Sequence, residues 1–285
     1  MEPHEAVRLF VNRELVAEEA GRRGNPGYPR LVAVRVLVYM ILRGLENDTR
    51  LVAHLVKNLH VARALGLKSI PHRTTVGRWW RRHVEALLDA FEGLSCLITV
   101  IEPTEVLVVD STPLEDYRDP EGRWGFSSKG FFKGFKVHAT VDQRGLPLRI
   151  HVTTGNRHDG PLLPLLVRGL AAEYVAADAA YDSKENRGAA KCIGAKAAIA
   201  VNPRNAKKPR RTRHKRILKR FRYLVEQLFS ILKGPLLKHG WTRVKGLAKK
   251  TALVYAASTA LLIRALEALL QGENQLLRRV STYWD

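Results

Sequence analysis

The chain has 285 residues, of which 46% are hydrophobic, and it carries a formal net charge of +21. This length allows one large domain or two ordinary ones, and the apolar content is sufficient for a buried core. The two cysteines, Cys96 and Cys192, are isolated in sequence, which excludes a C-x-x-C zinc site and argues against a disulfide framework. The N-terminus lacks an apolar signal core, and the longest uncharged apolar stretch, Thr251 to Ile263, is shorter than the ~20 residues of a membrane span. We therefore expect a cytoplasmic protein with no membrane contact.

The positive charge is concentrated in one stretch of the chain. Residues 201–250 contain 17 Lys and Arg and a single acid, Glu226, whereas the rest of the chain has 31 basic and 26 acidic residues. Such a concentration is typical of proteins that bind a polyanion such as DNA or RNA. A disordered basic run is the alternative, but we expect a track for DNA phosphates formed by Lys207, Lys208, Arg210, Arg211 and Arg213.

The first hundred residues have helical periodicity. Helices are predicted over residues 4–20 and 30–44, followed by two short helices, a break at Pro71, and a helix from about residue 76 that Thr74 or Thr75 would cap. This order resembles a helix-turn-helix reader of DNA, with four arginines at the head of its last helix: Arg73, Arg78, Arg81 and Arg82. A helical bundle with solvated arginines and core tryptophans is the alternative. We assign residues 1–100 to an all-α DNA-binding region.

The pattern changes to strands near residue 101. Buried or alternating strands are predicted over residues 106–110, 135–142, 147–155, 174–178 and 197–203, with helices between the later ones. Tight turns make the first three antiparallel, and helical crossovers make the later ones parallel. The sequence therefore predicts an α/β domain over residues 101–285, with a mixed five-stranded, ribonuclease-H-like sheet and flanking helices. A long helix is expected from about residue 217 to 238, and a last helix from 249 to 270.

Three acids fall where this sheet brings distant segments together. Asp110 ends the first strand and Asp178 ends the fourth, and these strands are neighbours in a ribonuclease-H-like sheet. Glu226 follows on the long helix, with Arg222 and Lys233 at spacings that predict one shared helix face. An exposed Arg222–Glu226 ion pair is the plainer interpretation of that spacing. Phosphodiester cleavage needs a water made nucleophilic and a leaving oxygen stabilised, and two divalent metal ions held by such carboxylates can do both.

Several other residues are weaker candidates for the site. Asp182 is an alternative second acid, Asp142 fits a turn, and His158 is a candidate to line the site. Trp241 fits core packing or stacking on a flipped base. Four more acids lie in a stretch rich in turn residues and are expected to be solvated: Glu115, Asp116, Asp119 and Glu121.

Taken in order, these motifs resemble those of the DDE transposases of bacterial and archaeal insertion sequences, over about residues 30–265. The resemblance rests on Asp110-Ser111-Thr112 after an apolar strand, on the Asp178-Ala179-Ala180-Tyr181 segment, and on the spacing of Arg222, Glu226 and Lys233. That last spacing marks the branch with a Tyr-Arg-Glu-Lys signature, although Lys219 stands at the position of its Tyr.

The resemblance implies that Asp110, Asp178 and Glu226 bind two Mg²⁺ ions, or Mn²⁺ in their place, and that Arg222 and Lys233 hold transposon-end phosphates. Water would free a 3′-hydroxyl at each transposon end, and that hydroxyl would attack double-stranded target DNA. A homodimer on DNA and an association with the nucleoid are expected. The alternatives are a catalytically inactive, transposase-derived DNA-binding protein and a nuclease that lacks strand transfer.

Overall fold

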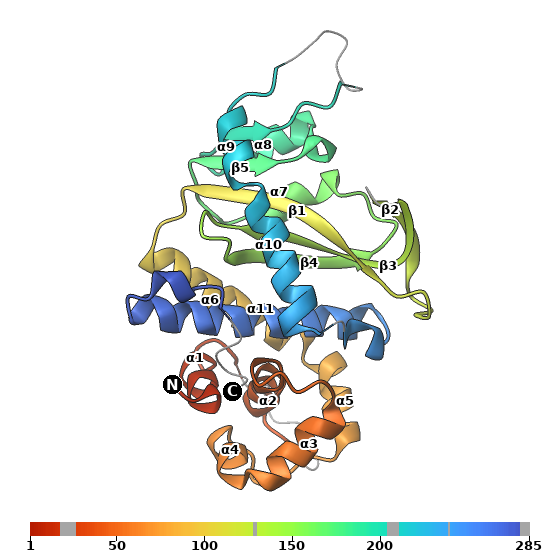
Figure 1. The fold of residues 1–285 in the computed structure, drawn as a ribbon, viewed down its shortest axis with the longest axis vertical. Helices are drawn as coiled ribbons and strands as arrows, with labels where there is room; N and C mark the ends of the chain where they lie inside the picture. Colours follow the sequence, from red (N-terminus) through yellow and green to blue (C-terminus); the bar gives the residue numbers. More distant parts are fainter. Residues whose placement is uncertain (18–26, 128–129, 204–210, 239, 280–285) are drawn as a thin grey trace. The chain divides into compact units, whose positions relative to one another are not determined.

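The chain folds into two compact units, which we call the helical unit and the sheet unit. The helical unit contains residues 1–94 and 231–285, and the sheet unit contains residues 95–230. The computed structural model describes residues 1–17, 27–127, 130–203, 211–238 and 240–279 (Figure 1). The division differs from the predicted one, because the chain beyond residue 230 joins the N-terminal helices instead of continuing the sheet domain.

The helical unit has a core of apolar helices. α2 (Arg30–Leu42) is buried along nearly its whole length, and α11 (Leu247–Leu270) packs against it. α11 is long and apolar enough to cross a membrane, but 89% of its most apolar window is buried inside the protein, as expected of a core helix. The other elements of the unit are α1 (Pro3–Phe10), α3 (Asp48–Lys57), α4 (Leu59–Ala64), α5 (Arg73–Arg82), the first part of α6 (Val84–Ile101), and the short turns η4 (Leu232–Leu236), η5 (Gly240–Arg243) and η6 (Asn274–Leu276).

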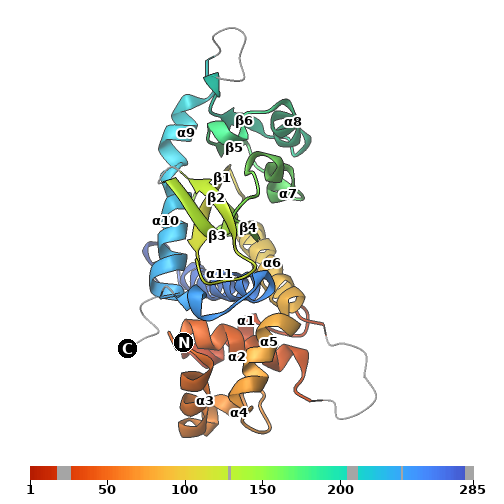
Figure 2. The same ribbon diagram turned by 90° about the vertical axis from the view of Figure 1, so that its right-hand side faces the viewer.

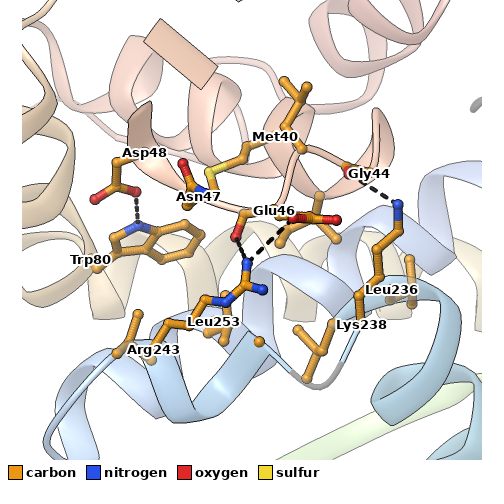
Figure 3. Close-up of a pocket in the computed structure, with 15 residues that line it drawn as sticks. Met40, Gly44, Glu46, Asn47, Asp48, Trp80, Leu236, Lys238, Arg243 and Leu253 are labelled. Carbon is orange, nitrogen blue, oxygen red and sulfur yellow. Dashed lines mark hydrogen bonds and ion pairs between the residues drawn. The ribbon is translucent and has the colours of Figure 1, made fainter. Parts of the chain in front are cut away.

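Polar contacts join the N-terminal and C-terminal segments of this unit (Figure 3). Arg243 Nη1 lies 3.3 Å from the carbonyl oxygen of Glu46 and 3.6 Å from its carboxylate, and Lys238 donates to the carbonyl of Gly44 at 3.1 Å. These residues line a cavity of about 110 Å³. Partners so remote in sequence leave no local pattern, which is why the sequence alone predicts a division at residue 100.

The helix predicted from residue 76 begins earlier, and it is divided into α5 and α6. α5 starts at Arg73 and is capped by His72, whose ring nitrogen accepts from Thr74 N, so the expected cap at Thr74 or Thr75 is wrong. Trp80 is buried and its indole donates to Asp48 at 3.0 Å, which makes it a core residue. The helix expected over residues 4–20 is also shorter, since α1 ends at Phe10, and residues 18–20 lie outside the described ranges.

The sheet unit contains a mixed sheet, and among the described residues it has six strands. β1 lies in the centre, antiparallel to β3 and parallel to β5, while β4 pairs antiparallel with β3 and β6 pairs parallel with β5. The order β4-β3-β1-β5-β6 is that of a ribonuclease-H-like sheet, which confirms the predicted fold class. The strands are β1 (Val106–Glu115), β2 (Arg123–Ser127), β3 (Gly130–Val141), β4 (Pro147–Thr154), β5 (Tyr174–Ala177) and β6 (Lys196–Ile199).

Helices cover both faces of this sheet. In Figure 2, α9 (Lys215–Phe221) and α10 (Tyr223–Ile231) lie on one face, and α7 (Leu163–Val167) and α8 (Lys184–Cys192) lie on the other. The long helix predicted to residue 238 ends at Ile231, where a π-helical turn containing Pro235 follows, because proline cannot continue an α-helix.

β2 is the strand that the sequence did not predict. It pairs antiparallel with the first half of β3 and forms a hairpin with it. The turn before β2 buries Asp116 and Asp119, whose carboxylates accept from Arg118 N and Glu121 N, so the expectation that these acids are solvated is wrong. The turn residues therefore close a structured connection between β1 and β2.

Residues 134–141 of β3 are buried on both faces, although the alternation of this segment predicted a half-buried strand. His138 and Thr140, on the polar side of the pattern, are fully buried. His138 Nε2 lies 2.9 Å from Thr153 Oγ1, and Thr140 donates to the carbonyl of Leu166 at 2.8 Å. These hydrogen bonds allow polar side chains to be buried under α7 and beside β4.

Candidate active site

The two aspartates lie side by side on neighbouring strands, where the parallel ladder between β1 and β5 ends. The prediction that the first strand ends at Asp110 is wrong, because β1 continues to Glu115 as the antiparallel partner of β3. β1 and β5 pair in parallel with Val109 opposite Ala177, and Asp110 and Asp178 are the next residues. The backbone at Asp178 is still extended, so both side chains project from the same face. Each carboxylate accepts a hydrogen bond from a nearby backbone N–H, Asp110 from Ser111 at 2.8 Å and Asp178 from Ala180 at 2.9 Å.

Arg222 links the third acid to this pair. Its Nη2 lies 4.0 Å from Asp178 Oδ2, and its Nε lies 3.8 Å from Glu226 Oε1 one helical turn along the chain. The plainer interpretation of the sequence, an ion pair between Arg222 and Glu226, is thus present. The same guanidinium also reaches Asp178, so the ion pair belongs to the surroundings of the aspartates. Both Arg222 and Glu226 are exposed to solvent.

Negative charge is concentrated at Asp110. The pKa of this carboxyl is raised to about 6, mainly by burial, and the charges of Asp178 and Asp159 act in the same direction. The Ser111 N–H and the Arg222 guanidinium oppose the rise by favouring the ionised form. A buried carboxyl beside other carboxylates is the electrostatic condition under which a cation is favoured, and such shifts are typical of functional sites.

Tyr181 and Asp159 lie beside the two aspartates. The pKa of Tyr181 is raised far above its usual range, first by burial and then by the charges of Asp159, Asp110 and Asp178. Lys136 Nζ lies 2.9 Å from Asp159 Oδ1 and offsets its charge. No local sequence pattern shows that the loop of Asp159 folds back beside Asp110.

The alternative candidates occupy other positions. Asp182 is buried, pairs with Arg187 at 2.8 Å and accepts from Asn202 N, which is a structural role. Asp142 accepts the N–H groups of the turn that follows it, which confirms its expected turn role. His158 is exposed and lines a cavity of about 620 Å³ together with Asp159.

Trp241 is buried in the helical unit, consistent with core packing instead of base stacking. Lys233 lies beyond the end of α10, in the π-helical turn η4, so the predicted helix face shared with Arg222 and Glu226 ends before it.

Most of the predicted DNA-binding residues that the structure describes are exposed, and Lys233 is half-buried. Arg73, Arg78, Arg81 and Arg82 are exposed on α5, opposite the buried side chains of Val76, Trp79 and Trp80. Arg211 and Arg213 are exposed before α9. Lys207, Lys208 and Arg210 lie outside the described residues.

The three acids have the right chemistry for a divalent metal ion but are not gathered into a closed ligand set. In the described part of the chain, no three His, Cys, Asp or Glu side chains lie close enough together to hold a metal ion as they stand. Two of the three carboxylates instead contact Arg222. Carboxylate oxygens are the ligands that Mg²⁺ prefers, so the donor set fits this class of ion.

Comparison with known proteins identifies the family. The family model described as "Transposase DDE domain" matches residues 101–263, more than half of the chain. The chain belongs to the DDE transposase family. A second family model, described as a transposase domain (DUF772), matches residues 3–82 of the chain. The matched DDE domain contains Asp110, Asp178 and Glu226.

Curated relatives of this DDE transposase family member are transposases of insertion sequences. It is 35% identical to the transposase for insertion sequence element IS1106 of Neisseria meningitidis serogroup B over 122 residues, which are 40% of this chain and 41% of that protein. It is 42% identical to the putative transposase for insertion sequence element IS6501 of Brucella ovis over 100 residues, 34% of this chain and 75% of that protein. The matched region thus spans under half the length of the first relative.

Among solved structures, a piggyBac transposase in a synaptic complex with hairpin DNA is similar to this chain. The TM-score is 0.47 and the sequence identity is 11%, over 99% of this chain and 81% of that chain.

Proposed function

We propose that this protein is a transposase that cuts DNA at the ends of an insertion sequence and joins the freed ends to target DNA. The observation that carries the proposal is the position of Asp110 and Asp178, side by side where the parallel ladder of β1 and β5 ends, with Arg222 linking Asp178 to Glu226. Membership of the DDE transposase family and the insertion-sequence relatives support the same reaction.

In this proposal Asp110, Asp178 and Glu226 are the ligands of two divalent metal ions, Mg²⁺ or Mn²⁺. Bound ions would supply Lewis-acid activation of the phosphate and of the attacking water. The raised pKa of Asp110 supports this assignment, because burial and, to a smaller extent, the charges of Asp178 and Asp159 disfavour its ionised form, which a bound cation would stabilise. The exposure of Glu226 supports it further, since its side chain on α10 is accessible to an incoming ligand.

The reaction consists of two phosphoryl transfers. In the first, the oxygen of water attacks the phosphorus at the transposon end, the bond from phosphorus to the 3′-oxygen breaks, and a 3′-hydroxyl is released. In the second, that hydroxyl attacks a target phosphodiester and a new 3′-oxygen-to-phosphorus bond forms. The bond from that phosphorus to the 3′-oxygen of the target strand breaks, and a target 3′-hydroxyl is released. Arg222 and Lys233 are proposed to hold the end phosphates, and a guanidinium suits this task because it bonds phosphate oxygens in pairs.

Double-stranded DNA is the proposed partner of both units. The exposed arginines of α5 in the helical unit would contact one DNA segment, and the basic residues before α9 would contact phosphates near the acids. We further propose the branch with the Tyr-Arg-Glu-Lys signature, on the spacing of Arg222, Glu226 and Lys233. A homodimer on DNA, and a location with the nucleoid, follow from a reaction that joins two ends.

The test is incubation of the purified protein with DNA that carries the ends of its own element, in the presence of Mg²⁺ or Mn²⁺. We expect cleavage at the ends followed by joined products. Glu226→Gln should abolish both steps while DNA affinity stays within about twofold of the wild type, and Glu115→Gln, in an exposed strand end, is the matched control.

Each other outcome of this incubation contradicts the proposal in a different way. DNA binding without nicking under either metal would identify an inactive, transposase-derived DNA-binding protein. Cleavage of arbitrary DNA without joined products would identify a nuclease that lacks strand transfer. Cleavage that survives Glu226→Gln would show that the third acid is assigned wrongly.

A further inference from the structure

The hairpin of β2 and β3 presents aromatic rings on one exposed face. Trp124 and Phe126 are two residues apart on β2 and therefore point to the same side, and Phe131 of β3 pairs directly with Phe126. Their exposed fractions are 61%, 65% and 77%. The Phe126 and Phe131 rings meet edge to face, with centroids 5.3 Å apart, a geometry that stabilises the hairpin and holds both rings in place.

The opposite face of the hairpin is closed against the protein. There Gly125 pairs with Phe132, which is buried. A Cβ added to Gly125 would lie 2.1 Å from the carbonyl oxygen of Gly155, so the backbone of β2 rests directly on the loop that follows β4. The hairpin is thus fixed on the sheet unit, and its aromatic face is the side left for a ligand.

A cavity of about 620 Å³ lies beside these rings and extends toward the acids. Its wall includes the three aromatic residues together with Arg157, His158 and Ala180. The backbone N–H of Ala180 is the group that donates to Asp178, and Asp159, also on the wall, contributes to the charge felt by Asp110. The volume is within the usual range for small-ligand pockets, and a nucleotide-sized group fits it.

The chemistry of the cavity selects one kind of occupant. Aromatic side chains stack on the flat faces of unpaired bases, and the contribution is ~1–3 kcal/mol per base for any base identity. Arg157 and His158 are exposed on the cavity wall, where they supply donors for the phosphate attached to such a base. The alternative occupant is a second copy of this chain. Such an interface would not require the cationic side chains of Arg157 and His158 beside the aromatic rings.

We propose that Trp124, Phe126 and Phe131 hold an unpaired nucleobase of the DNA strand whose phosphate lies at Asp110 and Asp178. A base removed from the duplex and stacked on this hairpin fixes the position of its phosphate. The hairpin thereby determines which phosphodiester reaches the acids and favours DNA ends or junctions that release a base easily. This inference rests on the proposed function, since it assigns a substrate feature to the same site.

The test measures binding without cleavage, in the presence of EDTA. The probe is a DNA duplex with one unpaired 2-aminopurine, and the reference is the same duplex fully paired. We expect the wild type to bind the first more tightly and to quench its fluorescence. Phe131→Leu and Trp124→Leu, made separately, should each weaken binding to the probe about fivefold or more, with paired-duplex affinity within about twofold.

Two controls separate stacking from apolar burial. Phe131→Trp keeps an aromatic face and should retain the quenching, whereas Leu165→Ala, an exposed apolar residue of α7, should change neither affinity. Equal binding of both duplexes by the leucine variants and the wild type would overturn the proposal. The proposal would also be overturned if Phe131→Asp lost self-association in sedimentation but still quenched the 2-aminopurine fluorescence. The aromatic face would then be an interface between two copies of the chain.

This experiment distinguishes its own failure from failure of the proposed function. Preference for the unpaired base with no DNA cleavage under Mg²⁺ would sink the transposase reaction and leave the stacking site standing. Cleavage and joining by a protein that shows no such preference would overturn the stacking site alone.

Discussion

Nη2 of Arg222 lies 4.0 Å from Oδ2 of Asp178, and the same guanidinium lies 3.8 Å from Glu226. A single positive charge thus stands between two of the three acids. The guanidinium compensates the negative charge of these two carboxylates. Because like charges repel, it also competes with any cation that they would bind. The charge at residue 222 is therefore expected to influence the affinity of the site for a metal ion.

Arg222→Gln is expected to bind Mn²⁺ more tightly in the absence of DNA, by about fivefold to tenfold, because a positive charge about 4 Å from two carboxylates is removed. The same variant should cleave DNA more slowly, because no guanidinium then holds the end phosphate. Electron paramagnetic resonance of Mn²⁺ during titration measures the affinity. Arg220→Gln, which removes an exposed charge from α9, is the control, and an unchanged affinity in Arg222→Gln would contradict the assigned geometry.

Asp110→Asn is expected to abolish cleavage and to raise the free energy of unfolding by about 1 kcal/mol. The amide oxygen can still accept from Ser111 N, while a poorly solvated charge beside Asp178 disappears. Asp182→Asn is the matched comparison, since it weakens a buried pair with Arg187 and should lower that free energy. Urea unfolding measures both changes, and a loss of stability in Asp110→Asn would show that the carboxylate is structural.

DNA binding is expected to weaken steeply as salt rises, because cations released from DNA phosphates drive binding. Replacing Arg78 and Arg81 together by Ala should reduce the slope of log affinity against log salt by about two, since each arginine neutralises one phosphate. Lys184→Ala, an exposed cation of α8 outside the predicted set, should leave the slope unchanged. Fluorescence anisotropy over a salt series measures it, and a flat dependence in the wild type would reject the phosphate contacts.

His138 is expected to make the sheet unit sensitive to acid. Burial lowers the pKa of His138 to about 4, partly opposed by Asp159, whose carboxylate lies 3.7 Å away. The unfolded chain takes up this proton below its ordinary pKa of about 6.5, while the folded chain does not, so stability is complete above that pH and is lost as the pH falls toward 4.

The loss attributable to His138 is about 2 kcal/mol between pH 7 and pH 5. Urea unfolding at the two pH values should therefore show a smaller difference for His138→Gln than for the wild type. His158→Gln, at an exposed position in the same unit, is the control and should match the wild type. An equal loss in His138→Gln and wild type would mean that other groups cause the acid sensitivity.

The order of the five predicted strands and the placement of Asp110 and Asp178 on neighbouring strands could be predicted from the sequence, because burial periodicity and turn residues are local signals. The continuation of β1 to Glu115 and the pairing of β2 were not predicted. The turn at Asp142 was predictable for the same reason, since its carboxylate bonds to backbone groups a few residues away. Glu226 stood out by charge alone, as the single acid in fifty residues.

Only the tertiary structure decided which distant segments meet. The return of α11 to the N-terminal helices, the link from Arg222 to Asp178, and the aromatic hairpin beside the loop at Gly155 all join residues far apart in the chain. The sequence determined the local conformations and the residue types of the site, because hydrogen bonds within elements and side-chain patterns act over a few residues. The partners across the fold depend on packing of whole elements, and no short-range pattern encodes that packing.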